Sequence, residues 1–177
     1  SGRAVLRNPP SGRALVGAIV AAMVDLPPLV GIPTEVEGIE LREELGRGHR
    51  SVVYRGRRGD EVYAVKLLRL GDTQNPTDAL LGFRREAATL ALIAHPGLPR
   101  IWSVGEHEGR PYLIMEHLDG EDLGSVLARG RLPEDEVVRI GVTLSGVLAA
   151  ASRHGLVHRD IKPGNIVVER DGRVRLV

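Results

Sequence analysis

The feature that most constrains the fold is a series of short apolar runs that begins at Ile39. Three runs rich in Val, Leu and Tyr cover Ile39–Leu45, Val52–Arg57 and Glu61–Leu68. Glycine-containing turns separate them, and the Arg58-Gly59-Asp60 segment is typical of a hairpin loop. The pattern therefore predicts three consecutive antiparallel strands.

The rest of the chain mixes further strands with longer helices. The apolar spacing and the Gly and Pro breaks predict helices over Asp78–Ala94, Asp122–Ala128 and Pro133–His154, and strands over Ile101–Glu106, Pro111–Glu116, Ile166–Glu169 and Arg173–Val177. Strands dominate the first part and helices come later, so the expected fold class is α+β.

Residues 1–37 are expected to form a separate lead-in segment, with a short apolar helix and a proline-rich linker. Ala14–Val24 is an apolar run of eleven residues that ends at Asp25 and Pro27. A membrane-spanning helix needs about 18 or more apolar residues, so we expect no membrane span. A buried helix, or a stretch that packs on a partner, is the expected use of this run.

Composition excludes several function classes. The 24 basic and 23 acidic residues nearly balance, which gives no sign of nucleic-acid binding. The absence of cysteine excludes disulfides and thiolate metal sites, and it fits a cytoplasmic location. Usage rich in Arg, Ala, Gly and Val hints at a bacterial source.

A glycine-containing hairpin loop is the first candidate for binding chemistry. Gly46, Gly48 and Ser51 lie between two expected strands, and Val53 follows them. Glycine allows backbone N–H groups to approach phosphate oxygens closely. An ordinary glycine hairpin is the alternative for this segment taken alone.

The two lysines of the chain are the second candidate. The chain has 22 arginines but only Lys66 and Lys162, which indicates that these positions need a compact ammonium group. In a strand, Ala64 and Lys66 share one face. A solvated edge charge is the alternative for Lys66. Glu86, in an expected helix, would orient Lys66 by an ion pair or would otherwise be a solvated helix-face charge.

The most specific signal is the segment His158-Arg159-Asp160-Ile161-Lys162-Pro163-Gly164-Asn165. It follows a long expected helix and precedes a strand. The spacing of Asp160 and Asn165 suits a loop that offers a carboxylate to a hydroxyl group and an amide oxygen to a metal ion. A zinc site is excluded because the segment has one His and no Cys or Glu at ligand spacing.

This segment resembles the H-R-D-x-K-P-x-N catalytic loop of eukaryotic-type serine/threonine protein kinases, and the other motifs occur in the family's order over Ile39–Val177. The resemblance implies ATP and Mg²⁺ as cofactors and a protein bearing Ser or Thr as substrate. Asp160 would accept the hydroxyl proton, Lys162 would contact the γ-phosphate, and Asn165 would hold Mg²⁺. Lys66, braced by Glu86, would hold the α- and β-phosphates.

The resemblance also implies the remaining cofactor contacts and the architecture. Met115 would be the gatekeeper, His158 would belong to the structural spine, and the nucleotide-binding set would be Gly46, Gly48, Ser51, Val53, Ala64, Lys66, Met115, Glu116, Leu118, Asp122 and Val167. The implied fold has a five-stranded antiparallel N-lobe sheet with helix C and the first part of the C-lobe. The N-lobe and hinge would cover 38–118 and the partial C-lobe 119–177.

The chain departs from the family pattern in two places. Ser51 replaces the third glycine of the loop, and the D-F-G motif would follow directly after Val177. We therefore expect these 177 residues alone to have little or no transfer activity. The helix over Pro133–His154 would expose an apolar face, so self-association, a partner or the N-terminal segment would cover it.

Two rival functions differ from a catalytic protein kinase. The first is a catalytically inert kinase-like module that binds a nucleotide or another protein. The second is a small-molecule phosphotransferase with a kinase-like N-lobe, which the Asp160-Ile161-Lys162-Pro163 run disfavours.

Overall fold

The computed structural model describes residues 33–48, 51–69, 80–83, 87, 91–155, 157–158 and 160–177. These residues form two compact units. The first comprises the described residues up to Ala91 together with Arg100–His117, and the second comprises Leu92–Pro99 with Leu118–Val177. The units are not continuous in sequence, because the chain enters the second unit at residue 92, leaves it after residue 99 and re-enters it at residue 118.

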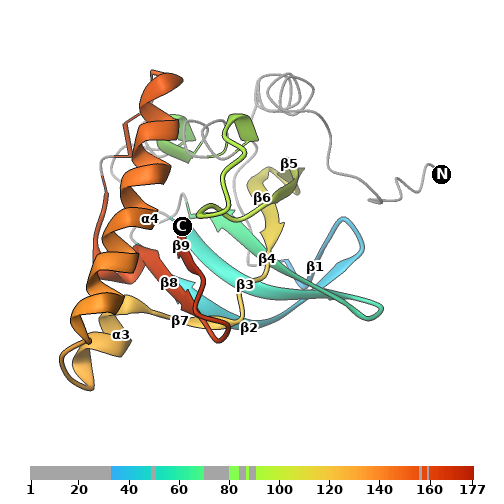
Figure 1. Cartoon of the computed structure of the whole chain (residues 1–177). Coiled ribbons are helices and arrows are strands. Elements are labelled where there is room, and N and C mark those ends of the chain that lie inside the picture. The colour runs from blue at the N-terminus through green and yellow to red at the C-terminus, as the bar shows by residue number, and fades with distance from the viewer. Residues whose placement is uncertain are drawn as a thin grey trace. The chain divides into compact units, whose positions relative to one another are not determined.

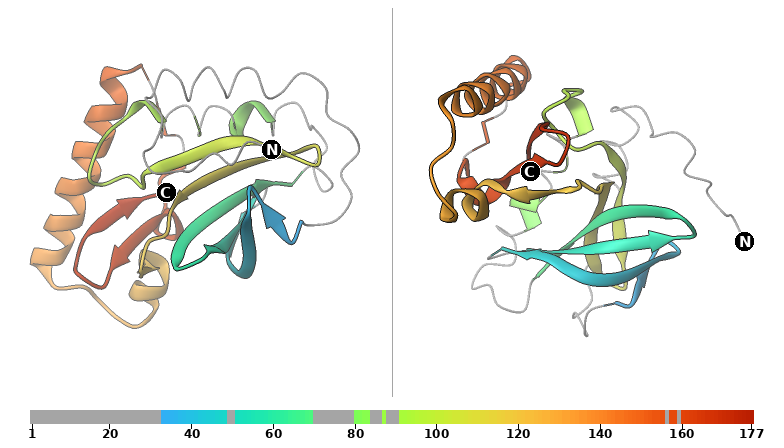
Figure 2. Two further views of the ribbon diagram at one scale, coloured as in Figure 1. Left: turned by 90° about the vertical axis from the view of Figure 1, so that its right-hand side faces the viewer. Right: turned by 60° about the horizontal axis from the view of Figure 1, so that its bottom comes forward.

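The first unit contains a six-stranded antiparallel sheet (Figure 1). Its strands, in the spatial order β1-β2-β3-β4-β6-β5, are β1 (Glu35–Val36), β2 (Ile39–Arg47), β3 (Ser51–Arg58), β4 (Glu61–Leu68), β6 (Arg110–Glu116) and β5 (Ile101–His107). The five predicted strands in this part of the chain are confirmed. The pairs β2–β3, β3–β4 and β5–β6 are hairpins, and β4 pairs with β6 (Figure 2).

The expected number of five strands is wrong, because β1 adds a sixth. Its two residues pair with the start of β2, Val36 opposite Ile39. The connecting residues Glu37 and Gly38 have φ of 52° and 75°. Two successive positive φ angles are the mark of the two-residue turn that best matches strand twist. The sequence analysis missed this turn because glutamate rarely occupies the first position of such a turn and because β1 has only two residues.

The main apolar core of the first unit lies on one face of this sheet. Its buried members are Val36, Ile39, Val52, Tyr54, Tyr63, Val65, Leu67, Tyr112 and Ile114. On β3, β4 and β6 these residues alternate with those that point to the other face. The alternation places Val53, Lys66 and Met115 on the face opposite this core.

The helix expected over Asp78–Ala94 falls largely outside the described residues. Residues 80–83, 87 and 91–92 are helical, and Phe83 and Ala87 are buried. Ile93 and Ala94 are not helical, so the helix ends two residues earlier than expected. Pro96 disfavours a helical conformation at the residue before it, which fits an early end.

The second unit combines a small antiparallel sheet with two helices (Figure 1). Its elements are β7 (Gly120–Asp122), α3 (Leu123–Ala128), α4 (Glu134–Arg153), the single 3-10 turn η1 (Pro163–Asn165), β8 (Ile166–Glu169) and β9 (Val174–Leu176). Both expected helices and both expected strands are confirmed, whereas β7 is an addition. No helix in this described part of the chain, or in that of the first unit, is long and apolar enough to cross a membrane.

The helix α4 is stabilised by the charges at its two ends and is held in the unit by its apolar face. Glu134, Asp135 and Glu136 occupy its first turn and Arg153 its last, where each charge opposes the helix dipole. Its buried residues are Ile140, Val147, Ala150 and Ala151. The helix contacts β9, the second strand after the catalytic-loop segment.

Candidate functional site

In the first unit, three predicted cofactor-binding residues form one row across the sheet. Gly46 pairs with Val53 between β2 and β3, and Val53 pairs with Lys66 between β3 and β4. Directly paired residues of antiparallel strands point to the same face. The structure therefore brings the glycine of the hairpin, an apolar side chain and an ammonium group together.

Ala64 and Met115 form the neighbouring row on the same face. They pair directly between β4 and β6, and each is buried. The next residue, Glu116, donates its backbone N–H to the backbone oxygen of Arg100 at 2.8 Å. Its side chain accepts a hydrogen bond from the backbone N–H of Arg100 at 3.0 Å. These bonds fix the end of β6, where the predicted hinge begins.

The glycine hairpin between β2 and β3 is closed by one backbone hydrogen bond, from the N–H of Gly48 to the oxygen of Ser51 at 2.9 Å. A Cβ atom added at Gly46 would meet no atom within 4 Å. Open space above this strand is what a phosphate group would need. Residues 49 and 50, at the tip, and Glu86, the predicted partner of Lys66, lie outside the described residues.

In the second unit, the three predicted catalytic-loop residues lie within hydrogen-bonding distance of one another. The Oδ2 atom of Asp160 accepts hydrogen bonds from Nζ of Lys162 at 2.8 Å and from Nδ2 of Asn165 at 2.9 Å. The Asn165 amide also donates to the backbone oxygen of Asp160 at 2.8 Å. The spacing of five residues thus brings the amide of Asn165 to the carboxylate of Asp160.

Local backbone structure places these side chains. The 3-10 turn η1 begins at Pro163, whose fixed φ suits the first helical position. The N–H of Asn165 donates to the oxygen of Lys162 at 2.9 Å and closes the turn. Asn165 then leads directly into β8, and its own backbone oxygen accepts a hydrogen bond from Val177 at 2.9 Å. Asn165 is therefore held from both sides.

The surroundings of Asp160 favour its charged form. The hydrogen bond from Lys162, followed by that from Asn165, lowers the pKa of Asp160 below its usual value. The side chain is 60% exposed, and that of Lys162 is 56% exposed. An ionised, accessible carboxylate beside an ammonium group can accept the proton of a substrate hydroxyl. The Nδ1 atom of His158 accepts the backbone N–H of Asp160 at 3.3 Å.

The predicted ribose-binding residue has a second task that the sequence did not reveal. Asp122 caps α3: its Oδ1 accepts the backbone N–H of Ser125 at 3.0 Å and its Oδ2 accepts the Ser125 hydroxyl at 2.6 Å. These bonds lower the pKa of Asp122. An acidic residue just before an apolar helical run is the signal that could have shown it.

Val167 and Leu118 are the remaining cofactor candidates in this unit. Asp122 and Val167 lie directly opposite each other between β7 and β8, so two predicted nucleotide contacts share one face. Leu118 is half-buried and begins the second unit, whereas Glu116 belongs to the first. The predicted hinge therefore spans the boundary between the units.

The described donor atoms fit Mg²⁺ and a triphosphate by their chemistry. Mg²⁺ prefers oxygen ligands and is commonly bound through one or two protein oxygens together with substrate phosphates. Asn165 supplies an amide oxygen beside the Asp160 carboxylate, and Lys66 supplies a compact cation suited to phosphate. In the second unit, Asn165 would hold the metal ion and Lys162 a phosphate oxygen. In the first unit, Lys66 would hold phosphate oxygens.

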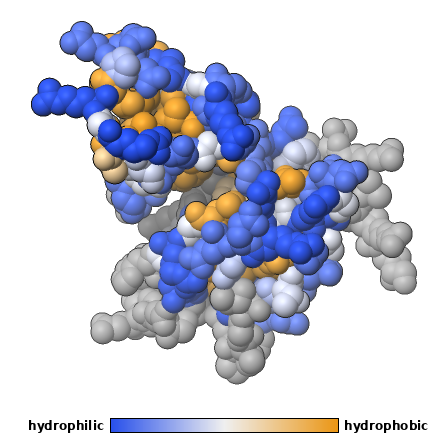
Figure 3. All heavy atoms as spheres, turned by 90° about the horizontal axis from the view of Figure 1, so that it is seen from below, coloured by the Kyte–Doolittle hydropathy of each residue, from blue (hydrophilic) through white to orange (hydrophobic). Residues whose placement is uncertain are grey.

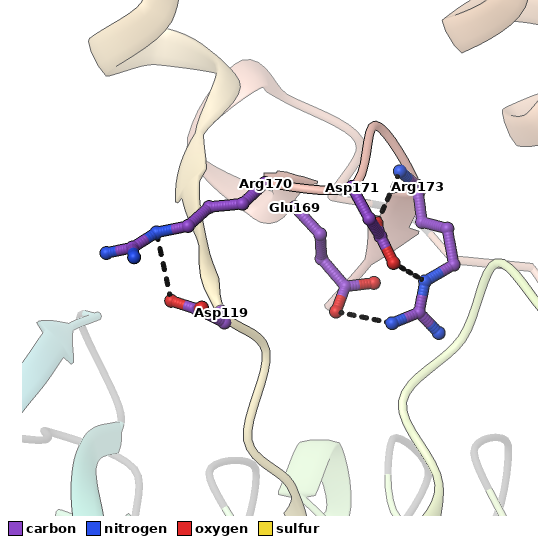
Figure 4. A pocket seen from close by; sticks show the side chains of 5 residues that line it. All are labelled: Asp119, Glu169, Arg170, Asp171 and Arg173. Carbon is purple, nitrogen blue, oxygen red and sulfur yellow. Dashed lines mark hydrogen bonds and ion pairs between the residues drawn. The ribbon is translucent and has the colours of Figure 1, made fainter.

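Two hollows of the second unit contain none of the predicted site residues. The smaller, of about 200 Å³, is lined by charged side chains that pair with one another: Asp119, Glu169, Arg170, Asp171 and Arg173 (Figure 4). The larger, of about 470 Å³, lies beside α4 and includes Val142 and Thr143. The charged side chains that line the smaller hollow pair with one another, so this hollow offers no distinct chemistry.

A buried charged residue escaped the sequence analysis. Arg175 lies in β9 between Val174 and Leu176, and its side chain pairs with Glu169. A charge inside a run of strand residues was the available signal. The sequence could not identify its partners, because two of them lie more than 70 residues away.

Comparisons with known proteins agree with this geometry. The family model described as the protein kinase domain matches residues 39–177. The chain is 36% identical to a probable serine/threonine-protein kinase PknB of Lactococcus lactis over 138 residues, which are 76% of this chain and 22% of that protein. It is 37% identical to the serine/threonine-protein kinase PknL of Mycobacterium tuberculosis over 141 residues, which are 77% of this chain and 35% of that protein.

The chain spans between about a fifth and a third of the length of these relatives. The match covers the sheet of the first unit from β2 onwards and all of the catalytic-loop segment. The resemblance in the sequence is thereby confirmed, and the chain belongs to the protein kinase domain family, whose members are transferases.

Proposed function

We propose that this chain is the ATP-binding part of a serine/threonine protein kinase, which transfers the γ-phosphate of ATP to a Ser or Thr hydroxyl of a protein. The family uses ATP and Mg²⁺, and the names of the relatives include the serine/threonine class. The observation that carries the proposal is the cluster of Asp160, Lys162 and Asn165, with both donors bonded to one carboxylate oxygen.

The roles in the second unit follow from the chemistry of these groups. The ionised Asp160 carboxylate orients the substrate hydroxyl and accepts its proton. The Lys162 ammonium, 2.8 Å from that carboxylate, neutralises charge on the transferred phosphoryl group. The amide oxygen of Asn165 holds a Mg²⁺ ion, which supplies positive charge to the phosphates. Positioning and electrostatics are the main demands of phosphoryl transfer.

The remaining roles concern the nucleotide. Lys66, oriented by Glu86, holds the α- and β-phosphates under the hairpin of Gly46, Gly48 and Ser51. Val53, Ala64, Met115 and Val167 enclose the adenine ring, the backbone groups of Glu116 and Leu118 bind its edge, and Asp122 contacts the ribose. The shared face of Val53, Lys66, Ala64 and Met115 supports this assignment.

Titration with Mg-ATP by calorimetry tests nucleotide binding. Replacing Lys66 with Ala removes the ammonium group that faces the phosphates, so we expect the affinity for Mg-ATP to fall at least about tenfold, which is 1.4 kcal/mol. Arg42→Ala removes an equally basic but exposed residue of β2 and should leave the affinity unchanged. Equal affinities of the wild type and the Lys66→Ala variant would contradict the proposal.

A transfer assay separates the catalytic function from its rival. Kinases turn over at about 1 to 100 per second, and Asp160→Asn, which replaces the acceptor carboxylate with an amide, should lower the rate by a factor of about 10² or more. A protein that binds Mg-ATP and transfers no phosphate would instead be an inert kinase-like module.

The partners are part of the proposal. The substrate would be a protein bearing Ser or Thr, and the exposed apolar side chains of α4 would be covered by self-association or by a partner. The division into a lead-in over 1–37, an N-lobe with hinge over 38–118 and a partial C-lobe over 119–177 remains a prediction, as does a cytoplasmic location.

A further inference from the structure

The side chain of Arg175 lies inside the second unit, although arginine is almost never fully buried unless it is paired. Its exposure and that of Glu169 are each 6%. Nε of Arg175 donates a hydrogen bond to Oε2 of Glu169 at 2.8 Å. A buried ion pair adds little net stability over well-packed apolar residues of similar size. Its presence therefore points to a task other than stability.

The Arg175 guanidinium binds a distant turn of the chain. Its Nη1 donates hydrogen bonds to the backbone oxygens of Pro96 at 2.7 Å and Leu98 at 3.0 Å. The oxygen of Gly97, between them, accepts the backbone N–H of Leu176 at 2.8 Å. Two successive residues of β9 thus bind three successive carbonyl groups, so the 96–98 turn acts as a second neighbour of β9, in addition to β8.

The 96–98 turn fits its site closely. A Cβ atom added at Gly97 would lie 2.6 Å from Cγ2 of Val147 on α4 and 3.1 Å from Nδ1 of His95. The same His95 nitrogen accepts the backbone N–H of Gly97 at 2.9 Å. The turn is therefore fixed on one side by α4 and on the other by the hydrogen bonds to β9. It offers β9 a rigid support.

Asn165 is hydrogen-bonded to the residue that directly follows β9. The residue after β9, Val177, donates its N–H to the backbone oxygen of Asn165 at 2.9 Å. The Asn165 side chain in turn donates to the backbone oxygen and the carboxylate of Asp160. The guanidinium binds the 96–98 turn, the turn binds Leu176, and the next residue, Val177, binds Asn165, so hydrogen bonds and the covalent backbone of β9 together connect Arg175 with Asp160.

We propose that Arg175 is a positioning residue for phosphoryl transfer: by fixing the 96–98 turn on β9, it holds Asn165 in the place where its amide meets Asp160. The contacts themselves are independent of function, whereas their meaning for catalysis rests on the proposed kinase activity. In this arrangement Arg175 acts through the backbone of β9.

Nuclear magnetic resonance of the full chain tests the positioning. Arg175→Met alone would leave the buried Glu169 with a longer, 3.4 Å contact to the exposed Arg173, so the informative variant is Glu169→Met with Arg175→Met, which removes both charges of the buried pair. We expect hydrogen exchange at the Leu176 amide to become at least about tenfold faster, and the side-chain amide resonance of Asn165 to shift or broaden. Circular dichroism would show that the variant is folded.

Arg173→Met is the matched control. Arg173 pairs with the same Glu169, but its side chain is 57% exposed and its Nε donates to the exposed Asp171. Both readouts should match the wild type in this control. If the double variant does not fold, Arg175→Lys replaces it, since a lysine keeps the charge but lacks the planar fork that reaches Glu169 and two carbonyls together.

Two results would overturn the proposal. Unchanged exchange at Leu176 in a folded variant would show that Arg175 does not fix the turn. Faster exchange with an unchanged Asn165 resonance would show that the turn is fixed but that Asn165 does not depend on it.

Ligand titration connects the positioning to function. In the double variant the affinity for Mg-ATP should fall about tenfold, while that for adenosine, which has no phosphates, should change less than twofold. Equal losses for both ligands would indicate general loosening and overturn the inference. If the wild type binds no Mg-ATP, the proposed function fails, and the resonance experiment still decides whether Arg175 positions Asn165.

Discussion

Asp160 shares one carboxylate oxygen between two hydrogen-bond donors, and this arrangement governs its protonation. The bond from Lys162 is the larger cause of its lowered pKa. Replacing Lys162 with Met should therefore raise the pKa of Asp160 toward the ordinary value of about 3.9. The carboxyl carbon resonance of Asp160, followed against pH, measures this shift directly.

The lowered pKa of Asp160 also determines how the stability of the fold changes with pH. A carboxyl group whose pKa is lower in the folded than in the unfolded state stabilises the fold above the unfolded pKa, and this contribution is lost as the pH falls through the folded pKa. The Lys162→Met variant should lose stability less steeply than the wild type as the pH falls below about 4. An Asp160 titration unaffected by the substitution would show that the ion pair is absent in solution.

Asp122 illustrates a residue with a structural role beside its predicted ribose contact. Asp122→Ala removes the cap of α3 and should lower the free energy of unfolding by about 1 kcal/mol. Asp122→Ser keeps a capping oxygen and should retain most of that stability. Chemical denaturation of both variants, with Glu121→Ala as an exposed neighbour, makes the comparison. Equal stability of the Ala and Ser variants would contradict the capping role.

At the scale of residues, the sequence identified the segment from Asp160 to Asn165 but not the hydrogen bonds within it. Asp160, Lys162 and Asn165 lie within six positions, so one turn of backbone brings them together. The burial of Arg175 and Glu169 could not be predicted, since charged residues are usually exposed and the carbonyl partners of Arg175 are remote in sequence.

Two glycines of the second unit have opposite expected effects when alanine replaces them. Gly97→Ala places a methyl group 2.6 Å from Val147, so it should destabilise the unit by about 1 to 3 kcal/mol. Gly141→Ala, in the middle of α4, meets no atom within 4 Å and should stabilise the helix by about 0.5 to 1 kcal/mol. Thermal unfolding of both variants measures the difference, and a stabilised Gly97→Ala variant would contradict the tight turn.

At the scale of elements, periodic segments were predicted and very short ones were not. The strands β2 to β6 and both helices α3 and α4 have apolar patterns long enough to recognise. The strands β1 and β7 have two and three residues, which is too few for any period to appear. They form because β2 and β8 offer unpaired backbone groups at their edges.

Apolar side chains reach the surface of the molecule in patches bordered by hydrophilic residues (Figure 3). On α4 the exposed members are Val137, Val138 and Val142, of which Val142 is 68% exposed. Contiguous apolar surface of this kind favours association. We expect the chain to form dimers or larger species as its concentration rises, and Val138→Glu with Val142→Glu to reduce this association about tenfold or more.

Light scattering at several concentrations measures the association. Arg139→Glu changes a charge on the same helix without removing an apolar side chain, and it serves as the control. A wild-type chain that stays monomeric over the whole concentration range would contradict the expectation.

At the scale of the whole molecule, the sequence could not show how the chain is shared between the two units. The linear order of motifs suggests one boundary near residue 118, yet residues 92–99 group with the second unit. This assignment depends on contacts with α4 and β9 that are 50 to 80 positions away in sequence. Local sequence patterns do not indicate contacts between residues so far apart in the chain.

The passage of residues 92–99 through the second unit also decides how this protein can be dissected. A cut near residue 118 would leave the first fragment carrying eight residues stripped of their packing partners, and the second fragment lacking the piece that Arg175 and Val147 surround. Neither lobe can thus be produced intact as one uninterrupted length of polypeptide. During synthesis on the ribosome, likewise, the turn at Pro96 can form its hydrogen bond with Arg175 only after 79 further residues have been added.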